Sequence, residues 1–171
     1  MTKYKILLLT FLSFIIVGCS TLINKKNVEL PLKKRYAISS FWNYTETPMA
    51  GLRASTIVES VLSKNSIDIT SLIGGSQEME SVKSKKSFLN SKKLEAKSKG
   101  ANYLITGDVQ EWRYKTGIDG EPVVSFGITI IDLESDRVIF NGVGASSAWG
   151  HKSIGVEAQE IAQKLIPKFV N

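Results

Sequence analysis

ANYLITGDVQEWRYK, residues 101–115, is the first of three β-rich runs that set the class of the fold. The other two runs cover residues 121–133 and 137–148, and two short segments, residues 116–120 and 134–136, join them. Gly and Asp in these joining segments are typical of turns between paired strands. The sequence therefore predicts three strands in an antiparallel meander.

Strand and helix patterns also precede and follow these runs. Alternation predicts a strand at residues 35–41, and Thr47-Pro48 has the chemistry of a helix N-cap and first turn. A short strand near residues 67–69, a lysine-rich helix ending at Lys99 and a last helix over residues 153–169 follow. This order predicts an α+β fold, a mixed sheet with helices packed on one face. The opposite face then needs polar residues or a partner.

Residues 1–18 have the features of a bacterial lipoprotein signal. Two lysines precede an apolar run over residues 6–17, and small Gly18 stands directly before Cys19, the single cysteine. The run has the length of a signal h-region and falls short of the roughly 20 residues that span a bilayer. An ordinary secretory peptide or a short membrane anchor is the alternative. We expect cleavage before Cys19 and acylation of this residue, with palmitate among the acyl groups.

The mature chain would then hold 153 residues, which suits one domain with a core. We expect residues 19–34 to be the lipidated cysteine and a tether, because Pro31 interrupts a segment without sustained periodicity. Residues 35–171 are expected to form a single α+β domain. Ser20, instead of Asp, after the cysteine favours the outer membrane in Gram-negative sorting. The predicted location is therefore the periplasmic face of the outer membrane, with a lipid anchor.

The formal charge of +6 is unevenly distributed. Residues 83–99 hold seven lysines, whereas residues 101–171 hold nine acidic and six basic side chains. No nucleic-acid motif accompanies the basic segment. The lysine run is interpreted as a solvated helix face, with contact to anionic lipid as the alternative.

The sequence argues against an enzyme and predicts no cofactor or metal. His151 is the only histidine, so neither a histidine-based metal set nor a Ser-His-Asp triad can form. Asp119 and Glu121 could serve as acid and base, but they lie in or beside a turn without apolar surroundings to raise a pKa. A solvated hairpin is the simpler interpretation.

The segment from Glu111 to Lys115 is a possible interface. Trp112 and Tyr114 would share one face of a strand, and Glu111, Arg113 and Lys115 would form a charged row on the other. Such a row can simply confer solubility. Exposed Trp, Tyr and Arg are also common in protein contacts.

Four groups of residues occur in a recognisable combination. They are the lipobox at Cys19, Phe41-x-Asn43-x-Thr45-x-Thr47-Pro48-x-Ala50-Gly51, the block Glu111-Trp112-Arg113-Tyr114-Lys115-Thr116-Gly117 with Gly120-Glu121-Pro122, and Ser147-Ala148-Trp149-Gly150. Together they resemble the PelC family, the outer-membrane lipoproteins of Pel exopolysaccharide export. The resemblance covers essentially the whole mature chain, although the lysine-rich residues 83–99 carry no family motif.

The resemblance implies a non-enzymatic protein with a fold like the N-terminal domain of TolB. It implies a homo-oligomeric ring, a dodecamer in the family, whose acidic funnel guides a cationic exopolysaccharide to an outer-membrane β-barrel porin. Asp119 and Glu121 are the expected funnel residues, although Asp119 could equally be a turn former. Trp149 is the expected membrane contact, with a capping core position as the alternative.

Two other classes of protein stay open at this point. A periplasmic lipoprotein that scaffolds or activates a cell-envelope enzyme would have a similar fold, and it need not oligomerise. A carbohydrate-active enzyme is a more distant alternative, because the chain has one histidine and isolated carboxylates.

Overall fold

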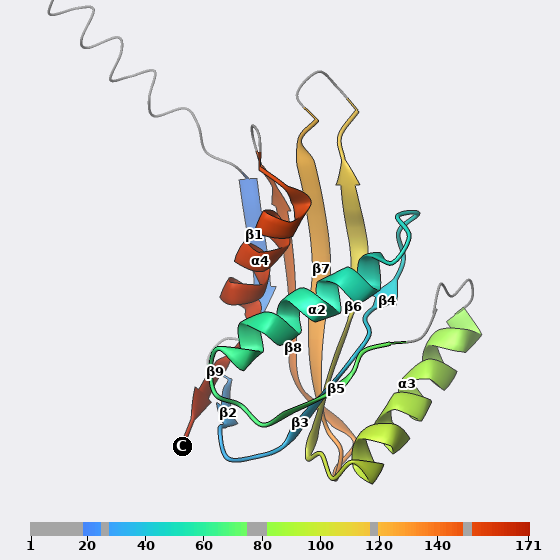
Figure 1. Cartoon of the computed structure of the whole chain (residues 1–171), viewed down its shortest axis with the longest axis vertical. Coiled ribbons are helices and arrows are strands. Elements are labelled where there is room, and N and C mark those ends of the chain that lie inside the picture. Colours follow the sequence, from blue (N-terminus) through green and yellow to red (C-terminus); the bar gives the residue numbers. More distant parts are fainter. Residues whose placement is uncertain (1–18, 25–27, 75–81, 117–119, 149–151) are drawn as a thin grey trace, which may run out of the picture.

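A mixed sheet forms the centre of the molecule (Figure 1). The structure is a computed structural model, and it describes residues 19–24, 28–74, 82–116, 120–148 and 152–171. Within these ranges the sheet order is β1-β8-β7-β6-β3-β5, and β4 pairs with β6 off this path. The strands are β1 (Cys19–Asn24), β3 (Tyr36–Ser39), β4 (Trp42–Asn43), β5 (Ile69–Leu72), β6 (Tyr103–Tyr114), β7 (Pro122–Asp132) and β8 (Arg137–Ser147). A separate parallel pair joins β2 (Glu29–Pro31) to β9 (Lys168–Val170).

The predicted meander is confirmed. Strands β6, β7 and β8 pair antiparallel along nearly their whole length, with one register shift in each ladder. Strand β3 pairs parallel with both β5 and β6, which makes the sheet mixed. The α+β class predicted from the order of elements is therefore correct.

The helices are α2 (Ala50–Ser63), α3 (Val82–Ser98) and α4 (Ile154–Leu165). Helices α2 and α4 cover one face of the sheet and bury the main core, as predicted (Figure 1). The prediction that the helices pack on one face of the sheet is wrong for helix α3. Its Ala96 packs in a second cluster with Ala37 and Leu104, whereas neighbouring Ile38 belongs to the main core. Successive strand residues point to opposite faces, so α3 lies on the other side of the sheet.

Residues 19–34 differ from the expected tether. Cys19 to Asn24 pair residue by residue with β8, and Glu29–Pro31 pairs with β9. The first part lacks alternation because apolar side chains occupy both faces of the strand: Leu22 lies on the α4 side, and Ile23 is 71% exposed on the other. Residues 19–24 and 29–31 thus belong to the folded body, which the prediction began at residue 35.

Two helix ends also differ from the prediction. Helix α2 begins after Met49, which has a left-handed φ of 61° and makes no side-chain cap, and Thr47 Oγ1 instead donates to the carbonyl of Trp112. Helix α4 ends at Leu165, and Phe169 lies in strand β9. Pro167 explains this end, because a proline disfavours helical backbone at the preceding residue. Among the described residues, the helices are too short or too polar to cross a bilayer.

Candidate functional site at the anchor end of the sheet

The strand termini at one end of the sheet bring together most of the residues predicted to be functional. Cys19 pairs with Ser147, Ser147 pairs with Val123, and Val123 pairs with Arg113. Neighbouring strands lie about 4.8 Å apart, so this row spans about 14 Å from β1 to β6. We call this end of the sheet, where β1 begins, the anchor end, after the lipid anchor expected at Cys19 (Figure 1).

The turn between β6 and β7 lies at the anchor end. The Lys115 N–H donates to the carbonyl of Glu121 at 2.7 Å, and Lys115 Nζ lies 2.8 Å from Glu121 Oε2. The Glu121 side chain is therefore paired with a cation, which weakens it as a source of negative potential. Asp119 lies outside the described residues, between Thr116 and Gly120, so its predicted role stays a prediction.

The connection between β8 and α4 lies at the same end. Trp149 is outside the described residues, so its exposure stays a prediction. On one side of it, Ala148 is 5% exposed and its N–H donates to the Pro122 carbonyl at 3.3 Å. On the other side, Ser153 caps α4, because its Oγ accepts from the Val156 N–H at 3.3 Å. Both flanks of this connection are thus fixed to the fold.

The predicted interface from Glu111 to Lys115 is divided between core and surface. Trp112 is only 3% exposed and packs in the main core, so the expectation of an exposed tryptophan is wrong. Tyr114 is 50% exposed, and its hydroxyl accepts from the Ile154 N–H at 3.4 Å. Arg113 Nη2 lies 3.2 Å from Glu111 Oε1, and the two side chains are 59% and 41% exposed.

An apolar groove beside Tyr114 was not found from the sequence. It has a volume of about 500 Å³ and lies where α2, the end of β6 and the start of α4 meet. Its walls include Leu52, Ile57, Trp112, Tyr114 and Ile154. Three separate parts of the chain form it, so no local pattern in the sequence could have indicated it.

The lysines of α3 contact acidic residues of the C-terminal half. Lys85 Nζ lies 3.1 Å from Asp108 Oδ2, and Lys93 Nζ lies 2.7 Å from Asp136 Oδ1. The hydrogen bond and charge of Lys93 lower the pKa of Asp136. The interpretation of the lysine run as a solvated helix face is therefore wrong for Lys85 and Lys93, which pair with carboxylates of the C-terminal half.

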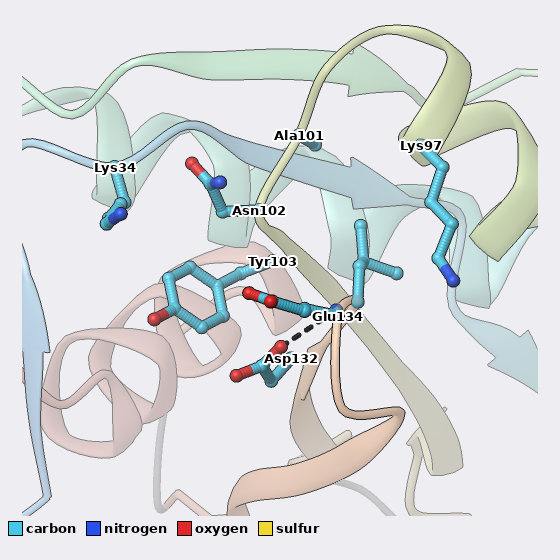
Figure 2. A pocket seen from close by; sticks show the side chains of 8 residues that line it. Lys34, Lys97, Ala101, Asn102, Tyr103, Asp132 and Glu134 are labelled. Atoms are coloured by element: carbon cyan, nitrogen blue, oxygen red, sulfur yellow. Dashed lines mark hydrogen bonds between the residues drawn. The ribbon is translucent and has the colours of Figure 1, made fainter.

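A polar pocket lies at the opposite end of the sheet (Figure 2). Its volume is about 330 Å³, and Asp132, Glu134, Lys34, Lys97 and Tyr103 are among the residues that line it. Asp132 Oδ1 accepts from the Glu134 N–H at 2.8 Å, which fixes this turn. Burial, followed by the nearby Asp132 and Glu134, raises the pKa of Tyr103. The mixture of charges gives this pocket no single-sign field for a charged polymer.

No group of three or more His, Cys, Asp or Glu side chains is arranged to hold a metal ion within the ranges that the structure describes. The charged side chains near the anchor end occur mostly as pairs of opposite sign. This end of the sheet therefore offers backbone edges, an apolar groove and paired charges, which suit the binding of another molecule.

Comparison with known proteins identifies similar structures. The PelC dodecamer of Paraburkholderia phytofirmans matches with a TM-score of 0.72 and 29% sequence identity, over 86% of this chain and 94% of that one. A second crystal form of that protein, with one substitution, matches equally well over 95% of its chain. The lipoprotein GNA1162 of Neisseria meningitidis shares the fold at a TM-score of 0.50 and 12% identity, over 77% and 96% of the two chains. No family model and no curated protein matches the chain.

Proposed function

We propose that the chain, a PelC-like protein by fold and sequence, guides an exported polysaccharide through the periplasm to the outer membrane. Cys19 carries the lipid anchor, copies of the chain form a ring, and the ring leads a cationic exopolysaccharide to a β-barrel porin. The observation that carries this proposal is the similarity, over most of both chains, to a protein solved as a dodecamer.

The place of Cys19 supports a ring held against the membrane. Cys19 is the first residue of β1, and β1 is an integral edge strand of the main sheet. An acylated residue at this position brings the anchor end of each domain to the lipid surface. Several acyl chains hold a protein stably, because each buried methylene contributes about 0.8 kcal/mol.

An exposed apolar surface supports association between copies. Ile23 and Val143 are register partners in β1 and β8, and they are 71% and 37% exposed. Their neighbours Leu22 and Gly144 face α4, so Ile23 and Val143 lie on the side of the sheet away from that helix. A second copy that covers this surface would remove apolar area from water.

The proposed polymer contact lies near the membrane. Asp119 stands in the sequence between the end of β6 and the start of β7, and both of these lie at the same end of the sheet as Cys19, so we expect its carboxylate to act near the membrane. One exposed carboxylate attracts a cation by about 1 kcal/mol at most. Repeated around a lumen, identical carboxylates would bind a multivalent chain at many points. Asp119 carries this role more than Glu121, because Lys115 pairs with Glu121.

The proposal is tested in cells that lack the protein. A conduit predicts that secreted polysaccharide falls and that polymer accumulates in the periplasm, because synthesis continues while passage stops. A protein that activates an envelope enzyme predicts instead a cell-wall defect with normal polymer secretion. Restoration of secretion by the wild-type chain is the control, and normal secretion without the chain would contradict the proposal.

A further inference from the structure

A second pocket at the anchor end lies between α4 and the edge of the sheet. It has a volume of about 230 Å³, compared with about 30 Å³ for one water in the liquid. Six of its lining residues matter for the argument: Ser20, Ser146, Lys152, Glu157, Glu160 and Lys164. We call it the β1–α4 pocket, and Figure 1 shows α4 lying over β1 and β8 there.

The buried carboxylate of Glu157 forms one wall of the pocket. Glu157 is only 2% exposed, and Ser146 Oγ donates to its Oε2 at 2.6 Å. The other oxygen, Oε1, is buried and accepts no hydrogen bond from the described residues. Lys152 Nζ lies 3.1 Å from Oε1 and donates to Glu160 at 2.9 Å, so one ammonium is shared between the two carboxylates. Oε1 thus has a shared ion pair but no aligned hydrogen bond, so it favours a ligand that supplies a further N–H or O–H.

The pocket is lined by equal numbers of positive and negative side chains. Glu157 and Glu160 provide two carboxylates, and Lys152 and Lys164 provide two ammonium groups. The hydrogen bond to Glu160 above all, with Glu157 adding to it, raises the pKa of Lys152, so this lysine stays charged. Such a site is complementary to a small group that itself carries one cation and one anion, and it has no net attraction for a simple ion of either sign.

The position of the pocket relative to the membrane follows from a lipid anchor at Cys19, so this step rests on the proposed function. Ser20 lines the pocket and directly follows Cys19, so its Cα lies about 3.8 Å from that of the acylated residue. The polar layer on each side of a bilayer is about 5–8 Å thick. The mouth of the pocket is therefore at the level of the lipid headgroups when Cys19 carries its acyl chains.

We propose that the β1–α4 pocket binds the phosphoethanolamine headgroup of a membrane phospholipid. The primary ammonium of the headgroup donates to Glu157 Oε1 and faces Glu160, and its phosphate accepts from Lys152 and Lys164. A trimethylated ammonium has no N–H to donate, so a choline headgroup cannot satisfy Oε1. The pocket thus adds a lipid contact beside the anchor and fixes how the domain is oriented on the membrane.

The test uses the lipidated mature protein in detergent micelles, with binding measured by calorimetry or ligand-detected NMR. The probes are glycerophosphoethanolamine, glycerophosphocholine, inorganic phosphate and glucosamine. We expect glycerophosphoethanolamine to bind best, and Glu157→Gln to weaken its binding about tenfold or more through loss of a charge-assisted hydrogen bond. Glu95→Gln, on α3 at the far side of the sheet, is the matched control and should bind as the wild type does.

Any one of four results would overturn the proposal. The choline compound or inorganic phosphate binds as tightly as the ethanolamine compound, glucosamine binds more tightly than it, or Glu157→Gln leaves its binding unchanged. Glucosamine binding would assign the pocket to polymer. Lys164→Met is a second variant that leaves the buried carboxylate in place. This variant should weaken the binding of glycerophosphoethanolamine about tenfold, and it serves as the test if Glu157→Gln does not fold. None of these measurements involves polymer export or ring formation, so the pocket and the proposed function can fail separately.

Discussion

Cys19 is the register partner of Ser147 in the ladder between β1 and β8. The residue expected to carry lipid is thus hydrogen-bonded into the sheet, through a strand that continues to Asn24. An acyl group at the start of a paired strand transmits the position of the membrane directly to the fold. A free tether of some 15 residues would instead allow the domain to lie up to about 50 Å from the lipid.

A flexible insertion tests whether this rigid link matters. Ten Gly/Ser residues placed between Cys19 and Ser20 would let the domain lie on average about 17 Å from its anchor. We expect secretion of polymer to fall severalfold while the protein stays in the outer-membrane fraction. Cys19→Ser, the companion variant, should release the protein into the soluble periplasm and abolish secretion. Unchanged secretion with the insertion would mean that the link serves only as a tether.

Gly144 in β8 tests how closely α4 packs on the sheet. A Cβ at this position would lie 2.5 Å from Ile161 Cγ2 and 3.0 Å from Leu22 Cδ2, so Gly144→Ala must displace side chains of α4 and β1. We expect a loss of about 1–3 kcal/mol and a melting temperature several degrees lower. Gly127→Ala, with nearest contacts of 3.5 Å, is the matched control and should change the melting temperature little. Equal melting temperatures for both variants would show that α4 adjusts freely.

Much of the sheet was predictable because its signals are local. The three strands from Ala101 to Ala148 have β-rich composition and turn residues between them, and the structure confirms their pairing. Thr47-Pro48 likewise indicated a helix, and α2 begins two residues later, at Ala50. The edge strand β1 was missed, because its partners lie about 120 residues away in β8 and its own sequence has no alternating pattern.

The candidate site was predictable only in its parts. The sequence singled out Cys19, Trp112 and Tyr114, but it could not show that Trp112 turns into the core while Tyr114 stays half exposed. A shift in register between Val109 and Glu111 changes which side chains of β6 face the core, and no local residue pattern predicts this shift. Glu157 went unnoticed because its burial depends on packing between α4 and β8, and a lone Glu on a helix is normally solvated.

A charge series at Asp119 tests the polymer contact. Asp119→Asn keeps most turn chemistry and removes the charge, whereas Asp119→Lys reverses it. Because a cationic polymer is attracted by the summed potential of a ring, secretion should fall in the order wild type, Asn, Lys. The mass of the oligomer and the melting temperature should stay constant across the series. Equal secretion from all three proteins would show that the charge of Asp119 does not attract the polymer.

Trp149 tests the membrane contact at the anchor end. Tryptophan has an apolar body and one N–H donor, which suits the lipid–water interface. We expect Trp149→Ala to reduce secretion while the melting temperature of the mature protein changes by less than about 2 °C. The neighbouring Ala148 is buried, so Ala148→Leu is a comparison that should lower the melting temperature. A loss of several degrees in Trp149→Ala would place this tryptophan in the core instead.

The central claim is that copies of this chain enclose a passage, and native mass spectrometry of the lipidated mature protein in detergent tests it most directly. The account predicts one dominant closed assembly with a mass of about twelve mature chains, by similarity to the dodecamer of Paraburkholderia phytofirmans. The assembly should persist on dilution, because a conduit must stay closed while polymer passes. A monomer or dimer at all protein concentrations would contradict the account, because neither can enclose a polymer, and would favour a scaffold of a cell-envelope enzyme.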